Sequence, residues 1–213
     1  MNVKPVDDPR IAFFDSIADK WDSWQNLPAL DGKLDAVLAE FGIHAKEAVL
    51  DIGCGTGNLT VSLLRRLGPS GRVISIDISE KMLNRAQGKA DDARVSWRLS
   101  PADQLPVADS AIDRAICFSA WPHFQNPEAV AREIHRVLRP GGHLHILHLV
   151  SRMKVNRVHA EAHPSVQHDL LIPVNETAEL LEANQVRVIS MTDNDQCYLV
   201  TACKQGSNRD AVP

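Results

Sequence analysis

The feature that most constrains this chain is a short apolar run that ends in an acid and three alternating glycines. Residues 49–58 read VLDIGCGTGN. Continuous apolar runs are typical of buried parallel strands, and glycines allow a tight turn in which the backbone approaches a ligand. Apolar residues then recur at helical spacing as far as Leu67. The segment therefore predicts a strand, a glycine turn and a helix in succession.

A second acid follows at the distance that a nucleoside-binding fold requires. Asp77 ends the apolar run 73–76, about 20 residues beyond Gly57, where Rossmann-type folds place the acid that binds ribose hydroxyls. We expect Asp77 to bind a ribose and Ile78 to flank an adenine. The alternative is that Asp77 only caps a helix that begins near Ser79. The chain is therefore expected to bind a nucleoside-containing cofactor.

The glycine spacing selects among such cofactors. A dinucleotide fingerprint has a glycine at its sixth position, in a turn that faces a pyrophosphate, and this chain has Asn58 there. Asp51 two residues before Gly53, followed by alternating glycines, instead resembles the first motif of class I S-adenosylmethionine-dependent methyltransferases. The resemblance implies an enzyme that uses S-adenosyl-L-methionine, with Asp51 near the amino acid end of the cofactor. The alternative for Asp51 is an acid that only caps the next helix.

The resemblance extends from about residue 13 to residue 204. Residues 100–106 are similar to the family's segment over the adenine, with Asp103 as the contact to its amino group, and residues 139–142 resemble the turn before its fifth strand. Residues 13–22 resemble the opening of the quinone-type methyltransferases. The implied cofactor contacts are Asp51, Gly53, Cys54, Gly55, Gly57, Asn58, Asp77, Ile78, Met82, Ala102, Asp103 and Ser119.

Strand and helix patterns alternate along the chain after a helical N-terminal segment, in which Trp21, Trp24 and Leu27 recur at helical spacing. This order predicts an α/β fold, a doubly wound and mainly parallel seven-stranded sheet. A hairpin-like turn at 192–196 joins the last two strands, so the last strand is expected to be antiparallel. Strands are expected at about 47–52, 72–77, 94–99, 113–119, 143–150, 186–193 and 196–203, and helices at 57–67, 79–88, 127–138 and 175–184.

Three regions are expected. Residues 1–44 form helices that cover the active site, residues 45–204 form the cofactor-binding domain, and residues 205–213 form a flexible tail. Residues 151–174 interrupt the alternation, since they are rich in basic residues and histidine. Open α/β sheets carry substrate loops outside the carboxyl ends of their strands, so we expect this insertion to be a substrate lid.

Nine histidines are present, and three of them are candidate catalytic residues. His123 follows the fourth expected strand, His148 lies near the end of the fifth, and His159 lies in the expected lid. One of them is expected to act as a general base, because imidazole titrates near neutrality. Alternatively they bind a divalent metal, which no local motif supports, or have no direct role. His143 and His145 share one face of a strand and are expected to be packing residues.

Composition and missing motifs restrict the acceptor. The net charge of −4 and pI near 6.1 argue against affinity for nucleic acid or an anionic membrane, and no apolar run reaches the ~20 residues of a membrane span. Four unpaired cysteines indicate the reducing cytoplasm. Residues 119–122, SAWP, lack the motif of enzymes that methylate nucleic-acid amino groups. A small molecule is the expected acceptor, for a monomer or homodimer. The rivals are a non-catalytic cofactor- or metal-binding module and a nicotinamide-dependent oxidoreductase.

Overall fold

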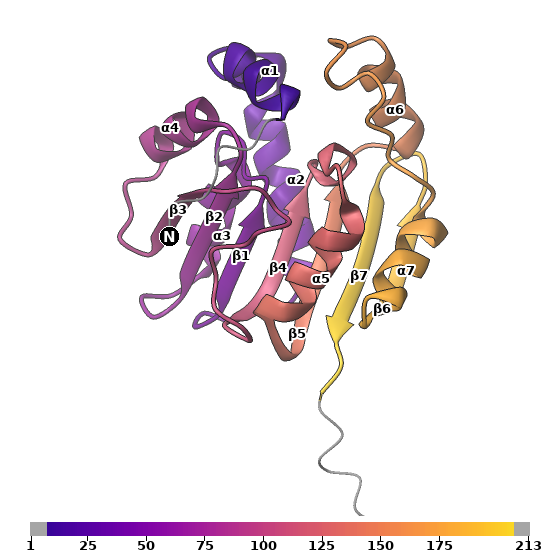
Figure 1. The fold of residues 1–213 in the computed structure, drawn as a ribbon. Coiled ribbons are helices and arrows are strands. Elements are labelled where there is room, and N and C mark those ends of the chain that lie inside the picture. The colour runs from indigo at the N-terminus through magenta and orange to yellow at the C-terminus, as the bar shows by residue number, and fades with distance from the viewer. Residues whose placement is uncertain (1–7, 207–213) are drawn as a thin grey trace, which may run out of the picture.

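A single seven-stranded sheet organises the computed structural model, which describes residues 8–206 (Figure 1). The strand order is β3-β2-β1-β4-β5-β7-β6, and only β7 runs against its neighbours. The expected fold, including the antiparallel last strand, is thereby confirmed. The strands are β1 (Ala48–Ile52), β2 (Arg72–Asp77), β3 (Val95–Leu99), β4 (Ile112–Phe118), β5 (Leu138–His148), β6 (Val186–Asp193) and β7 (Tyr198–Lys204).

The strand order reverses at β1, which pairs in parallel with both β2 and β4. All five β1 residues are buried, because helices cover both faces of the sheet at this point. In open α/β sheets the ends of such central strands border the ligand crevice. The fold therefore places the glycine turn, which follows β1, at the centre of the carboxyl edge.

Two apolar cores flank the sheet. On one face α2 (Leu27–Glu40) and α3 (Asn58–Arg66) bury Leu38 and Leu63 against Val49. On the other face α5 (Pro127–Val137) and α7 (Val174–Ala183) bury Ile134 and Leu181. Helix α4 (Glu80–Lys89) packs along β2 and β3. Burying a large aliphatic side chain contributes about 1.5–3 kcal/mol, so these two layers hold the edge of the sheet rigid.

The N-terminal segment is helical, as expected, over the residues that are described, although residues 1–7 lie outside them. Its helices are α1 (Pro9–Ile17), the 3-10 turn η1 (Trp21–Trp24) and α2. The spacing of the tryptophans predicted a continuous helix, but the helical structure is interrupted between η1 and α2. The break arises because Asn26 caps α2, accepting a 3.1 Å hydrogen bond from the Ala29 amide.

One strand boundary and one segment differ from expectation. β5 begins at Leu138, not near residue 143, because Leu138 already pairs with Ile112 of β4. Residues 139–142, the expected turn, form an irregularity within the strand, and the pairing resumes between His143 and Arg114. Gly142 makes this possible, since a Cβ there would lie 2.9 Å from the carbonyl oxygen of Arg139. The expected lid contains a regular helix, α6 (Arg152–Ala160).

Helices α1, α4 and α6 lie above the carboxyl ends of the parallel strands, together with the 3-10 turn η2 (Trp121–His123) (Figure 1). Segments from the beginning, middle and end of the chain therefore meet over one edge of the sheet. Among residues 8–206, no helix combines the length and the apolar character needed to cross a bilayer.

Candidate active site

A cavity of about 480 Å³ opens at the carboxyl ends of β1, β2, β4 and β5. Ten of the twelve expected cofactor contacts line it, the exceptions being Asp51 and Gly57. The three candidate histidines also line it, although they come from η2, β5 and α6. Its volume lies in the range of about 300–1,000 Å³ that is typical of small-ligand sites.

The glycine turn forms one wall of the cavity. Gly53 and Gly57 are required by close packing, since a Cβ on Gly53 would lie 2.5 Å from Cβ of Ala120, and one on Gly57 would lie 2.9 Å from Cβ of Ala86. Gly55 differs, because nothing lies within 4 Å of its added Cβ. Gly55 lines the cavity, so its missing side chain leaves room there for a ligand.

Asp77 ends β2 with its side chain on the cavity wall. Its Oδ2 accepts a 2.8 Å hydrogen bond from the Gly55 amide, and its Oδ1 accepts one of 2.9 Å from the Ser79 amide. Burial raises the pKa of Asp77, although these amides partly oppose that effect. The N-cap of α4 is Ser79. Each oxygen of Asp77 keeps a second lone pair, which can accept a ribose hydroxyl.

Asp51 does not line the cavity. Its carboxyl group is fully buried, and Oδ2 accepts a 2.6 Å hydrogen bond from Oγ1 of Thr60 in α3. Among the described residues, no partner reaches Oδ1. Burial raises the pKa of Asp51 to about 7, although the bond from Thr60 opposes this. Its contacts join β1 to α3, so a direct contact with a cofactor remains a prediction.

The three candidate histidines converge. The ring centroids of His123 and His159 lie 4.8 Å apart. His148 is only 2 % exposed, and no described residue bonds its Nε2. Burial, reinforced by the other two rings, lowers the pKa of His148 to about 3. His148 is therefore neutral at neutral pH and is a much weaker base than free imidazole.

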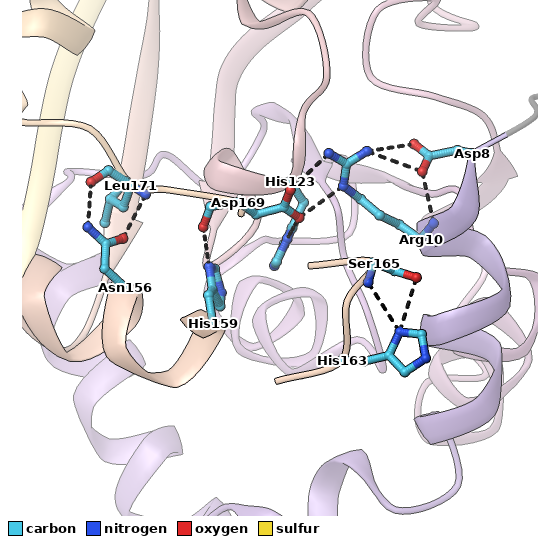
Figure 2. Close-up of polar contacts among 9 residues, drawn as sticks. All are labelled: Asp8, Arg10, His123, Asn156, His159, His163, Ser165, Asp169 and Leu171. Atoms are coloured by element: carbon cyan, nitrogen blue, oxygen red, sulfur yellow. Dashed lines mark hydrogen bonds and ion pairs between the residues drawn. The ribbon is translucent and has the colours of Figure 1, made fainter. Parts of the chain in front are cut away.

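Asp169, an acid that no sequence motif marks, contacts two of these rings (Figure 2). Oδ2 of Asp169 lies 2.7 Å from Nδ1 of His123, and Arg10 donates two 2.9 Å hydrogen bonds to the same carboxylate. The main-chain carbonyl of Asp169 contacts Nδ1 of His159. Burial raises the pKa of Asp169, but the bonds from His123 and Arg10 outweigh burial and hold it below its usual value. Asp169 is therefore ionised at neutral pH.

Side chains of the N-terminal helices line this cavity. Phe14 and Trp21 line it, and the Phe14 ring packs edge-on against His123 with centroids 5.1 Å apart. Asp22 accepts a 2.8 Å hydrogen bond from Thr56 in the glycine turn and pairs with Lys89 of α4. The N-terminal segment is therefore fixed both to the glycine turn and to helix α4.

His143 and His145, which share one face of β5, have a packing role. The His145 ring stacks on Phe41 at a centroid distance of 3.7 Å. Nη1 of Arg114 lies 2.8 Å from Nε2 of His145. Since a guanidinium can only donate, Arg114 is the donor of this hydrogen bond and Nε2 is the acceptor. Neither His143 nor His145 lines the cavity. Across residues 8–206, no cluster of three His, Cys, Asp or Glu side chains has an arrangement that would hold a metal ion.

Known proteins resemble this chain in sequence. Residues 50–146 match a family described as a methyltransferase domain. The demethylmenaquinone methyltransferase of Lactobacillus johnsonii is 31% identical over 63% of this chain, and that match covers 58% of the relative. The ubiquinone/menaquinone biosynthesis C-methyltransferase of Dinoroseobacter shibae is 35% identical over 63% of this chain and 56% of its own length. The chain thus spans little more than half the length of these relatives.

Solved structures share the fold. A SAM-dependent methyltransferase from Aquifex aeolicus superposes with a TM-score of 0.65 and 25% identity, over 82% of this chain and 97% of that one. Sheet, glycine turn and strand-end acid define a class I methyltransferase domain. Residues 50–146 carry the methyltransferase domain, and the chain resembles the class I S-adenosylmethionine-dependent methyltransferases of the quinone-methyltransferase-like group.

Proposed function

We propose that this chain transfers a methyl group from S-adenosyl-L-methionine to a small organic acceptor inside the cavity. The observation that carries the proposal is that one cavity combines the glycine turn and Asp77 with a cluster of three histidines. The first two suit a nucleoside, and the histidines suit proton removal from an acceptor.

The lining favours a cofactor without a pyrophosphate. Asp77 and Asp103 line the cavity, and Asp77 accepts a hydrogen bond from the Gly55 amide of the glycine turn. Lys89, which bonds Thr56 and Asn58 in this turn, is paired with Asp22. Acidic groups repel phosphates, whereas Asp77 can accept hydroxyl hydrogens and Ile78 and Met82 offer apolar surface to a base. When bound, S-adenosyl-L-methionine would supply a methyl group activated by attachment to a positively charged sulfur.

The chain's own residues would align the acceptor and remove its proton. Phe14, Trp21, Phe124 and Val158 form an apolar lining that excludes water from the reacting groups. His123 is the strongest candidate for a general base, since it has a carboxylate at Nδ1, which stabilises the protonated ring. His159 is next to it and belongs to residues 151–174, which we propose to form a lid over the cavity.

Two arguments support a small acceptor. The relatives reported above carry names from menaquinone and ubiquinone biosynthesis, and the cavity is lined mostly by apolar and aromatic side chains. An aromatic or quinone-like ring would fit such a lining. The net charge of −4 is unfavourable for nucleic acid.

Thermal shift with S-adenosylhomocysteine, NADH and Zn²⁺ side by side tests the proposal. Stabilisation by S-adenosylhomocysteine alone is expected, with affinity in the low micromolar range or tighter. Release of S-adenosylhomocysteine in a screen of small acceptors then tests catalysis. Stabilisation by NADH would favour an oxidoreductase. Binding of S-adenosylhomocysteine without release from any acceptor would favour a non-catalytic module.

A further inference from the structure

Asp169 contacts the two cavity histidines with two chemically different groups (Figure 2). Its carboxylate faces Nδ1 of His123 at 2.7 Å, and its main-chain carbonyl faces Nδ1 of His159. Both groups only accept hydrogen bonds, so each Nδ1 must carry a proton. In a neutral ring the other nitrogen, Nε2, is then the basic atom. No described residue bonds Nε2 of either ring, and both rings line the cavity.

Arg10 fixes the carboxylate from the opposite side. Its Nε and Nη2 each donate a 2.9 Å hydrogen bond to Asp169, and the side chains of the pair are only 13% and 7% exposed. A bidentate guanidinium restricts both the position and the plane of a carboxylate. Arg10 belongs to α1, whereas Asp169 lies in the loop after α6. The contact therefore joins the N-terminal cover to the expected lid.

Helix α6 also holds the loop that carries Asp169. Asn156 of α6 accepts a 2.8 Å hydrogen bond from the Leu171 amide and donates one of 3.1 Å to the Leu171 carbonyl. Leu171 is fully buried. Asn156 and His159 thus bind the main chain of residues 169–171 from one helix, and this fixes where the Asp169 side chain emerges.

The charges around His123 single it out among the three rings. His148 has a pKa lowered to about 3, and His159 has a neutral carbonyl as its partner. Only His123 has a carboxylate partner, which stabilises a protonated ring. The titratable or charged groups that face it, directly or through Asp169, are Asp169, Arg10, His159, His148 and Asp77.

We infer that Asp169 is a positioning residue that presents Nε2 of His123 as the proton acceptor, and that Arg10 completes this arrangement only when α1 and residues 161–173 meet. The inference rests on the proposed methyl transfer. The acceptor gives its proton to Nε2 of His123 and its electron pair to the methyl carbon, whose bond to sulfur breaks with that pair left on sulfur. The Asp169 carboxylate balances the charge of the protonated ring.

Asp169→Asn separates the two contacts. It keeps the main-chain carbonyl that bonds His159, but its amide can donate to Nδ1 of His123 and favour the wrong tautomer. Nitrogen-15 NMR of the histidine rings, with S-adenosylhomocysteine bound and above neutral pH, should show His123 move its proton to Nε2. The His159 signals should not change. A change at both rings, or at neither, overturns the inference.

Asp193→Asn is the matched control, since Asp193 forms a 2.8 Å pair with Arg152 of α6 outside the cavity. It should leave both rings and turnover unchanged. With an acceptor from the screen, Asp169→Asn should lower kcat by about 10²–10⁴-fold with the KM for S-adenosyl-L-methionine unchanged. Arg10→Gln should also lower kcat, and Arg10→Lys should restore part of it. A raised KM with unchanged kcat would contradict the positioning role.

The two proposals fail in different ways. If S-adenosylhomocysteine does not bind the wild-type protein, the proposed function is wrong, while the ring spectra of the unliganded protein still test the contact between Asp169 and His123. If S-adenosylhomocysteine binds and the His123 tautomer is unaffected by Asp169→Asn, the methyltransferase proposal stands and the positioning inference is wrong.

Discussion

Oγ1 of Thr60 donates a 2.6 Å hydrogen bond to Oδ2 of Asp51, while Oδ1 of the same buried carboxyl group has no partner among the described residues. Burial raises the pKa of Asp51 from 3.8 to about 7. The folded state therefore binds more protons than the unfolded state between these values. The stability contributed by this group is present below pH 4 and is lost as the pH rises to 7.

Asp51→Asn should remove this pH dependence. The amide oxygen can still accept the bond from Thr60, so the variant keeps the contact and loses only the titration. In the wild type this group lowers the free energy of unfolding by about 1.4 kcal/mol per pH unit between the two pKa values. Urea unfolding of both proteins at pH 5 and pH 8 measures the difference. Equal pH dependence in the two proteins would show that Asp51 is ionised throughout.

His148 should have the opposite effect. Its pKa falls from 6.5 to about 3 on folding, so the unfolded state binds more protons between these values. The stability that depends on the neutral ring is complete above pH 6.5 and is lost as the pH falls toward 3. His148→Leu should abolish a slope of about 1.4 kcal/mol per unit over this range. His168→Gln, at an exposed position, is the control, and it should leave the slope intact.

The glycine turn gives a stability prediction with an internal control. Gly53 has a φ of +71° and no room for a Cβ, whereas Gly42 has a φ of +63° and open space around it. Gly42→Ala should cost only backbone strain, on the order of 1–2 kcal/mol. Gly53→Ala should cost about 1–3 kcal/mol more, because its Cβ would collide with Ala120. Chemical unfolding of the two variants measures both values, and equal losses would contradict the packing argument.

Asp77 should govern cofactor affinity. Asp77→Ala removes charge-assisted hydrogen bonds to a ribose, so binding of S-adenosylhomocysteine should weaken by about 1.5–3 kcal/mol, roughly ten- to a hundredfold. Calorimetry measures this directly. Asp92→Ala removes an acid whose partner is Arg94, away from the cavity, and should bind normally. Unchanged affinity of Asp77→Ala would exclude Asp77 as a ribose ligand.

The proposed lid predicts a pattern of hydrogen exchange. Residues 151–174 and the N-terminal helices should become slower to exchange when S-adenosylhomocysteine is added, because the cavity that they cover is then filled. Strands β1 and β4 should be slow in both states, since they are buried at the centre of the sheet. Full protection of residues 151–174 in the free protein would argue against a lid.

Local patterns in the sequence predicted most of the fold, and ten of the twelve residues that they marked as cofactor contacts line one cavity. The glycine turn, Asp77 and the strands are each specified by residues close together in the chain, so spacing alone locates them. The convergence of His123, His148 and His159 could also be expected, because the carboxyl ends of neighbouring parallel strands meet at one edge.

The rest depended on distant contacts. Arg10 and Asp169 are 159 positions apart, and neither belongs to a motif, so no local pattern joins them. The orientation of Asp51 is set by packing between β1 and α3, which the acid before the glycine turn does not reveal. The start of β5 was obscured because residues 139–142 form an irregularity inside the strand, and two glycines in sequence also suit a turn before a strand.

The separation of Arg10 from Asp169 also has a consequence for how the chain matures. Ribosomes add about 5–20 residues per second, so α1 emerges roughly 10–30 s before the residue that its arginine must bind. Asp15 of α1 can meanwhile bond Ser79, which is made much earlier. The newly made helix α1 can thus pack through Asp15 before Arg10 has its partner. The contact between α1 and residues 161–173 over the cavity therefore forms late in synthesis.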